Sequence, residues 1–328
     1  MKQSIWILSI LLALVILCGC AGPGRTGLSA PPESGTQAVS GPGDGPQSSP
    51  SEPQSTELQT AQSRYEPETA DPDAEFYLAD IEDLLARPAS PYAEHVYSHQ
   101  GTMIEEPSET FAAYDLALAY GSRCLEQDLV ISADGVLYCS HDLTPDALTG
   151  ETRRFSEMDS TEIDALRTKK GGQRLLRLSD VFHRYGTAVT YVIELRYPTL
   201  TLKPLYKLIE EYGMAENIIV QSPYLWDLLQ VEQVYPDMPK LFLVYNEKDF
   251  EDALQADYVD IVCVSGLLFD KESCERVHAA GKKYCVAVCS TAESIRKAIE
   301  IGADCYFTDY TAKALMLEEL YRRPAPGQ

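Results

Sequence analysis

The chain has 328 residues, 45% of them hydrophobic, and a formal net charge of −23 at pH 7. This acidity argues against nucleic-acid binding and against electrostatic docking on anionic lipid. The length allows one domain of about 250 residues together with segments outside it.

The first predicted element is an export signal over residues 1–19. Lys2 precedes an apolar run, Ile5–Leu17, which has almost no polar face and is short for a membrane span of about 20 residues. The segment ends in Leu17-Cys18-Gly19-Cys20 and resembles a bacterial lipoprotein signal. The resemblance implies that Cys20 carries lipid and anchors the protein to the extracytoplasmic face of a bacterial cell membrane. A plain secretory signal or a transmembrane anchor is the alternative.

Residues 20–75 are predicted to form a flexible tether. They are rich in Gly, Ser, Pro, Thr and Gln and contain hardly any large apolar side chains. Such a segment cannot bury enough surface to offset the entropy of ordering it. We therefore expect it to hold a folded domain away from the membrane surface.

The sequence pattern of residues 76–323 predicts one (β/α)8 TIM barrel. Short β-branched or aromatic runs alternate with amphipathic helical stretches, which is typical of βαβ units. The predicted strands are His95–His99, Cys124–Asp128, Val189–Arg196, Asn217–Ser222, Lys240–Tyr245, Tyr258–Ser265, Lys283–Cys289 and Asp304–Asp309. Helical patterns between them include Thr110–Tyr120, Leu202–Tyr212, Leu225–Val234, Lys271–Ala280 and Ala292–Ile301.

Two carboxylates lie close together in the second predicted strand. Glu126 and Asp128 are two residues apart, so their side chains share one face of the strand. Like charges held that close repel, and each pKa rises unless a cation lies between them. A divalent metal is the simplest explanation, although carboxylates at a strand end can also face solvent.

Other chemically active side chains stand at the ends of neighbouring strand-like runs. His99 ends the first predicted strand, His141 follows the run after Asp134-Gly135, and Glu194 and Arg196 end the third predicted strand. The carboxyl ends of barrel strands converge on one face, where these enzymes have their active sites. We therefore expect all of these side chains at one mouth. Taken singly, His99 can cap a strand, and Glu194 with Arg196 can form an ion pair.

These segments resemble the glycerophosphodiester phosphodiesterase family over most of residues 96–310. The family pattern is His-Arg-Gly, Pro-Glu-Asn-Thr, Glu-x-Asp, Asp-Gly, His-Asp, Glu-Ile-Lys and Thr-Asp-Tyr. The matching segments are His99-Gln100-Gly101, Pro107-Ser108-Glu109-Thr110, Glu126-Gln127-Asp128, Asp134-Gly135, His141-Asp142, Glu194-Leu195-Arg196 and Thr308-Asp309-Tyr310.

The resemblance implies a metal-dependent hydrolase. It implies a TIM barrel, one divalent cation held by Glu126, Asp128 and Glu194, and an acid–base pair formed by His99 and His141. The implied reaction converts a glycerophosphodiester into glycerol 3-phosphate and an alcohol. An all-oxygen ligand set selects Mg²⁺ or Ca²⁺ over zinc.

Three departures from the family pattern leave the substrate open. Gln100 replaces an arginine that contacts phosphate, Ser108-Glu109 replaces Glu-Asn, and Ala287 stands where the family usually has tryptophan. We expect Gln100 and Arg196 to bind the phosphate of the substrate, with Arg196 supplying the cation. The substrate is expected to be a small or polymeric glycerophosphodiester.

Two rival functions remain open at this point. One is a solute-binding lipoprotein, which would share the signal and the tether but would usually have two lobes. The other is a barrel that keeps the pocket but acts on another phosphodiester or has lost turnover.

Overall fold

The computed structural model describes residues 73–196 and 198–322, which fall within one compact unit, Glu66–Gln328. The predicted signal peptide, Cys20 and the tether up to residue 72 lie outside the described residues, and their roles stay predictions. Within the described part, no helix combines the length and apolar character that crossing a bilayer requires.

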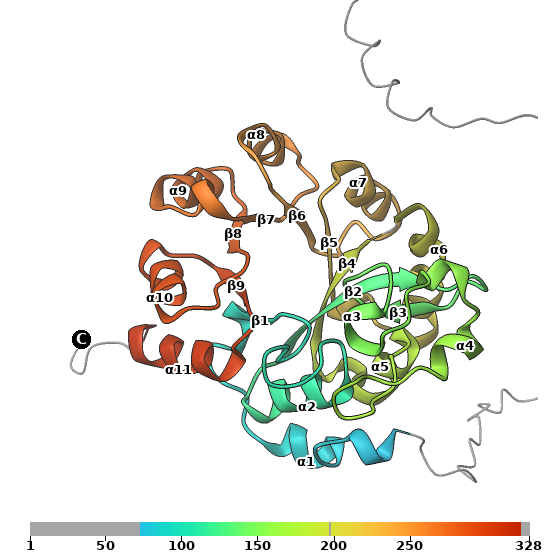
Figure 1. The fold of residues 1–328 in the computed structure, drawn as a ribbon. Helices are drawn as coiled ribbons and strands as arrows, with labels where there is room; N and C mark the ends of the chain where they lie inside the picture. The colour runs from blue at the N-terminus through green and yellow to red at the C-terminus, as the bar shows by residue number, and fades with distance from the viewer. Residues whose placement is uncertain (1–72, 197, 323–328) are drawn as a thin grey trace, which may run out of the picture. The chain divides into compact units, whose positions relative to one another are not determined.

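Eight parallel strands form a closed barrel, as the sequence predicts (Figure 1). The ring closes because β1 pairs with β9 on one side and, at Ser98 and Leu125, with β2 on the other. The barrel strands are β1 (Val96–Ser98), β2 (Cys124–Ile131), β4 (Thr190–Leu195), β5 (Ile218–Ser222), β6 (Lys240–Leu243), β7 (Ile261–Val264), β8 (Lys283–Val286) and β9 (Cys305–Thr308).

Helices cover the outside of the barrel (Figure 1). The longer ones are α2 (Phe111–Ala119), α5 (Leu178–Tyr185), α6 (Pro198–Tyr212), α7 (Leu225–Val234), α8 (Glu247–Gln255), α9 (Lys271–Ala279), α10 (Ala292–Ile301) and α11 (Thr311–Arg322). Their ends follow local capping chemistry. The Thr110 hydroxyl accepts the Ala113 N–H at the start of α2, and Gly302 ends α10 with a φ of +89°.

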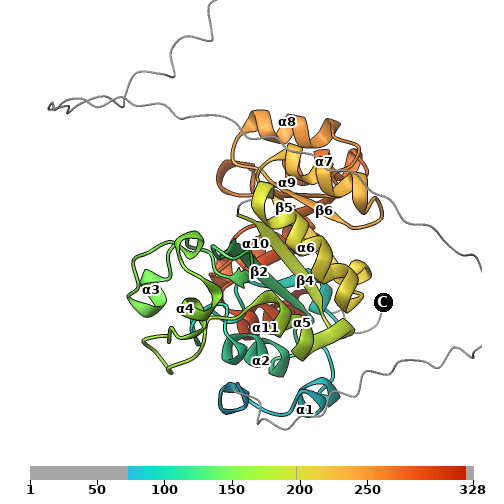
Figure 2. The ribbon, with the colours of Figure 1, turned by 90° about the vertical axis from the view of Figure 1, so that its right-hand side faces the viewer.

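One connection departs from a simple βα repeat. After β2 the chain turns at Gly135 and returns as β3 (Leu137–Cys139), which pairs antiparallel with β2 outside the ring. The short helices α3 (Asp146–Thr149) and α4 (Ser160–Asp164) follow and lie to one side of the barrel (Figure 2). This segment matters for the site because it carries His141, which lies two residues beyond β3.

A buried contact network attaches the first described segment, which includes α1 (Ile81–Ala86), to the barrel. Arg184 on α5 forms an ion pair with Asp115 on α2 at 2.6 Å, and both side chains are buried. Asp115 also accepts the Leu78 N–H at 2.9 Å, and the guanidinium of Arg184 lies 3.5 Å from the ring centre of Tyr77. An isolated charge here would be costly to bury, so the pair must form for this segment to pack.

Candidate active site

A tight turn after β1 carries two of the predicted site residues. The N–H of His99 donates to the Thr308 carbonyl of β9, and Gln100 and Gly101 follow with φ values of +50° and +82°. A Cβ on residue 101 would lie 2.7 Å from the Cβ of Ala113, so only glycine fits against α2 there. The turn directs the backbone N–H of Gln100 to Glu126 at 2.8 Å.

Glu126 and Asp128 point from one face of β2 into the barrel mouth, as their spacing predicts. Both are almost fully buried. Burial and, after it, the charge of Asp128 raise the pKa of Glu126 well above its ordinary value. Burial and, after it, the charge of Glu194 raise the pKa of Asp128 to about 6. The two carboxylates therefore repel each other when both are ionised, and a bound cation would relieve this repulsion.

Gln100 contacts a carboxylate. Its Nε2 donates to Oδ2 of Asp128 at 2.9 Å, while Oδ1 of Asp128 is buried and accepts no hydrogen bond from the described residues. Gln221 on β5 donates to Oε1 of Glu126 at 3.0 Å. The side-chain amides of Gln100 and Gln221 thus donate hydrogen bonds to the two carboxylates, and Oδ1 of Asp128 remains free for a ligand.

Glu194 on β4 and Arg196, the residue after the end of β4, complete the polar side of the mouth. Asp128 and Glu194 are direct neighbours across the β2–β4 ladder. Nη1 of Arg196 donates to Oε1 of Glu194 at 2.5 Å, so the same-face ion pair does form. It leaves both residues on the wall of the same cavity.

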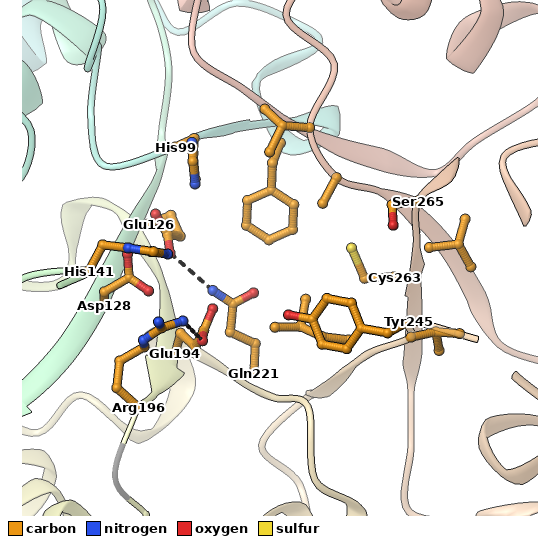
Figure 3. Close-up of a pocket in the computed structure, with 16 residues that line it drawn as sticks. His99, Glu126, Asp128, His141, Glu194, Arg196, Gln221, Tyr245, Cys263 and Ser265 are labelled. Atoms are coloured by element: carbon orange, nitrogen blue, oxygen red, sulfur yellow. Dashed lines mark hydrogen bonds and ion pairs between the residues drawn. The ribbon is translucent and has the colours of Figure 1, made fainter. Parts of the chain in front are cut away.

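The two histidines reach the cavity from different elements (Figure 3). Nδ1 of His99 lies 2.7 Å from Oδ1 of Asp309, and the other oxygen of that carboxylate, Oδ2, accepts a hydrogen bond from Ser290. Burial alone would raise the pKa of Asp309, but these hydrogen bonds outweigh it and lower the pKa. His141 is half exposed, and its Nδ1 lies 2.9 Å from Oδ1 of Asp142.

All the predicted site residues of the barrel line two adjoining cavities. A cavity of about 230 Å³ is lined on its polar side by His99, Glu126, Asp128, His141, Glu194 and Arg196 (Figure 3). A second cavity of about 310 Å³ shares both histidines and adds Gln100 together with residues of the loop after β3. The histidine pair therefore stands where the two spaces meet.

Sequence reasoning noted Glu109 as a departure but gave it no role. It is buried, its φ is +59°, and its Oε1 accepts the backbone N–H of Asp128 at 2.9 Å. Its other oxygen accepts a hydrogen bond from Tyr114. One oxygen of Glu109, one of Glu126 and one of Asp128 lie within 4.8 Å of one another. Burial and the Asp128 charge raise the pKa of Glu109.

The donor set fits a hard divalent cation. Carboxylate oxygens are the ligands that Mg²⁺ and Ca²⁺ take, and the buried, unpaired Oδ1 of Asp128 needs a positive partner. Glu126, Asp128 and Glu194 all line the cavity, whereas Glu109 is buried and is not part of the lining.

Comparison with known proteins is consistent with this arrangement. Residues 99–313 match the model of the Glycerophosphoryl diester phosphodiesterase family. A glycerophosphodiester phosphodiesterase of Caldanaerobacter subterraneus subsp. tengcongensis is 31% identical over 163 residues, which cover 46% of this chain and 66% of that protein. The matches to this and two further curated relatives span 66%, 63% and 58% of their own lengths.

Solved structures share the barrel fold. A glycerophosphodiester phosphodiesterase from Agrobacterium tumefaciens is 24% identical with a TM-score of 0.60, covering 67% of this chain and 99% of that one. An Oleispira antarctica phosphodiesterase in complex with the product sn-glycerol-3-phosphate is 19% identical with a TM-score of 0.62, covering 69% and 96%. Because the family model spans most of the barrel, the chain belongs to the glycerophosphoryl diester phosphodiesterase family.

Proposed function

We propose that this protein hydrolyses a glycerophosphodiester to glycerol 3-phosphate and an alcohol. The observation that carries the proposal is the placement of two histidines, three carboxylates and an arginine on one cavity at the carboxyl ends of the strands. Family membership and the names of the relatives support the same reaction. The closed single barrel does not have the two lobes usual for a solute-binding lipoprotein.

The residues Glu126, Asp128 and Glu194 would hold the divalent cation, Mg²⁺ or Ca²⁺. When bound, the cation supplies positive charge that stabilises the negative charge developing on phosphate. Gln100 orients Asp128 through its amide and thereby supports the ligand set. Arg196 would add a fixed positive charge beside the phosphate.

His99 would act as the base. The lowered pKa of Asp309 keeps that carboxylate ionised, so it accepts a hydrogen bond from Nδ1–H of His99. The lone pair of the imidazole is then on Nε2, which is free to take the proton of the attacking hydroxyl, whether from glycerol or from water.

His141 would act as the acid. It lies on the loop after β3 and is half exposed, so a departing alcohol beside it can reach solvent. Protonated, it would give its proton to the leaving alkoxide, which is a poor leaving group without it.

The test is release of glycerol 3-phosphate from glycerophosphocholine, glycerophosphoethanolamine and a glycerol-phosphate polymer, with Mg²⁺, with Ca²⁺ and with chelator. Each histidine-to-alanine variant should lose about 10²–10⁴ in kcat. His141→Ala should lose less on a nitrophenyl ester, whose leaving group departs unprotonated. The proposed function is wrong if the intact protein releases no product under any of these conditions.

We also propose that Cys20 is lipidated and anchors the enzyme on the extracytoplasmic face of a bacterial membrane. The support is the Leu17-Cys18-Gly19-Cys20 segment and the tether composition behind it. Cys20→Ala should move the full chain out of the detergent phase in a partitioning experiment. Retention of that variant in the detergent phase would contradict the assignment.

A further inference from the structure

The catalytic cavity has two unlike sides. The carboxylates, Arg196 and the histidines lie on one side, and Tyr245, Cys263 and Ser265 lie across from them (Figure 3). The part of the lining that comes from β6, β7, β8, β9 and the residues just after them is mostly apolar, and it includes Leu243, Tyr245, Val264, Ala287, Val288 and Phe307. A phosphate and the hydroxyls of glycerol need only the polar side, so the apolar wall has no partner in the reaction described above.

The apolar wall continues onto the surface of the protein. Large hydrophobic side chains between 42% and 98% exposed follow the carboxyl ends of four neighbouring strands, β5 to β8. We call this set the apolar rim; its members are Tyr224, Trp226, Tyr245, Leu267 and Val288.

The rim is joined directly to the cavity. Tyr245 and Val288 belong to both, and Leu267 stands two residues beyond Ser265, which also lines the cavity. Single exposed hydrophobic residues need no explanation, but a run of them around one part of an active-site mouth marks a binding surface. Aromatic side chains with a polar end, such as Tyr and Trp, suit the boundary between an apolar group and water.

Resting on the proposed function, we propose that the preferred substrate is a glycerophosphodiester that carries one apolar chain. Its phosphate and glycerol lie against the carboxylates and Arg196, and its chain runs along the apolar wall and leaves over the apolar rim. The small side chain of Ala287 leaves room along the wall that a large aromatic side chain at this position would fill. The chain can be an acyl group on the glycerol or the alkyl part of the leaving alcohol.

The experiment measures kcat/KM for glycerophosphocholine and for its acetyl, butyryl, hexanoyl and octanoyl esters on glycerol, all below the concentrations at which they aggregate. A second series carries the same chain lengths as alkyl leaving alcohols. Because burial of one methylene contributes about 0.8 kcal/mol, kcat/KM should rise about threefold to fourfold per methylene in the series that fits, until the chain leaves the rim.

Two variants connect the effect to the structure. Leu267→Ser removes the most exposed side chain of the rim and should lower the ratio of octanoyl to chainless kcat/KM by roughly tenfold. Ala287→Trp should flatten the dependence on chain length. The matched control is Leu320→Ser, which removes an exposed leucine near the end of α11, away from the mouth, and should leave the ratio unchanged.

Failure of this inference is distinguishable from failure of the proposed function. If glycerophosphocholine is hydrolysed but neither series shows a rise with chain length, the inference is wrong and the proposed function stands. If Leu267→Ser reduces binding to phosphatidylcholine vesicles while the chain-length dependence is flat, the rim contacts a membrane surface and the inference is again wrong. If no diester is hydrolysed, both fail.

Discussion

Replacing Asp309 with Asn would test the proposed role of His99 most directly. The carboxylate holds Nδ1 of His99 at 2.7 Å, and the two side chains are only 22% and 19% exposed. A hydrogen bond to a charged group contributes about 1.5–3 kcal/mol, so its loss alone corresponds to roughly 10–150-fold in kcat. If the amide group of Asn instead donates to Nδ1, the imidazole proton moves to Nε2 and the base is lost. The fall in kcat should then approach 10²–10⁴.

Steady-state kinetics on glycerophosphocholine measure this effect, with Ser290→Ala as the control. Ser290 donates to the same carboxylate, so its removal keeps the charge and should have a smaller effect. A loss of less than about threefold in Asp309→Asn would refute the assignment of His99 as an Asp309-oriented base.

The same variant predicts a pH dependence of stability. The hydrogen bonds lower the folded-state pKa of Asp309, so they stabilise the fold above its unfolded pKa of about 3.9. That stabilisation is lost as the pH falls through the folded-state value. Asp309→Asn should therefore lower Tm at pH 7 and have less effect in acid. An equal loss of Tm at both pH values would contradict this reasoning.

Three further changes test other parts of the structure. Glu126→Gln should weaken the affinity for Mg²⁺ or Ca²⁺, measured by calorimetry. The loss should be at least the roughly 10–100-fold that is typical of residues next to metal ligands. An affinity equal to that of the parent protein would exclude Glu126 as a ligand. Glu109→Gln should change that affinity little, because Glu109 is buried outside the cavity lining, and a loss as large as that of Glu126→Gln would make Glu109 a ligand. Asp115→Asn should destabilise the fold by about 3–5 kcal/mol because Arg184 would remain buried without its counter-ion, and a Tm within a degree of the parent would contradict this.

The barrel could be predicted because its signals are local. Each strand is a short apolar run followed by a helical pattern, and the two-residue spacing of Glu126 and Asp128 places both on one face of β2, as the structure confirms. The convergence of strand ends then places His99 and Glu194 at the same mouth.

The parts that could not be predicted depend on contacts between distant residues. Asp309 is 210 residues from His99 in sequence, and no periodicity links them. Glu109 reaches the backbone of Asp128 only because of a local turn with positive φ, which is rare for a glutamate. The contact between the Gln100 amide and Asp128 also joins residues far apart in sequence and was not predicted, while the role of Gln100 in phosphate binding stays a prediction.

Because the cysteines of the barrel are buried, the protein is more sensitive to oxidation while it folds than after it has folded. All seven cysteines in the described residues are buried, and Cys263, Cys285 and Cys305 are direct neighbours across β7, β8 and β9. Burial raises the pKa of Cys124 to about 12, which disfavours the thiolate that exchange with disulfides requires. In the unfolded chain the same thiols have a pKa near 8.5 and are within reach of oxidants. The folded protein should tolerate an oxidising medium that its newly made chain does not, so the yield of refolding should depend on reductant while the Tm of the folded protein does not.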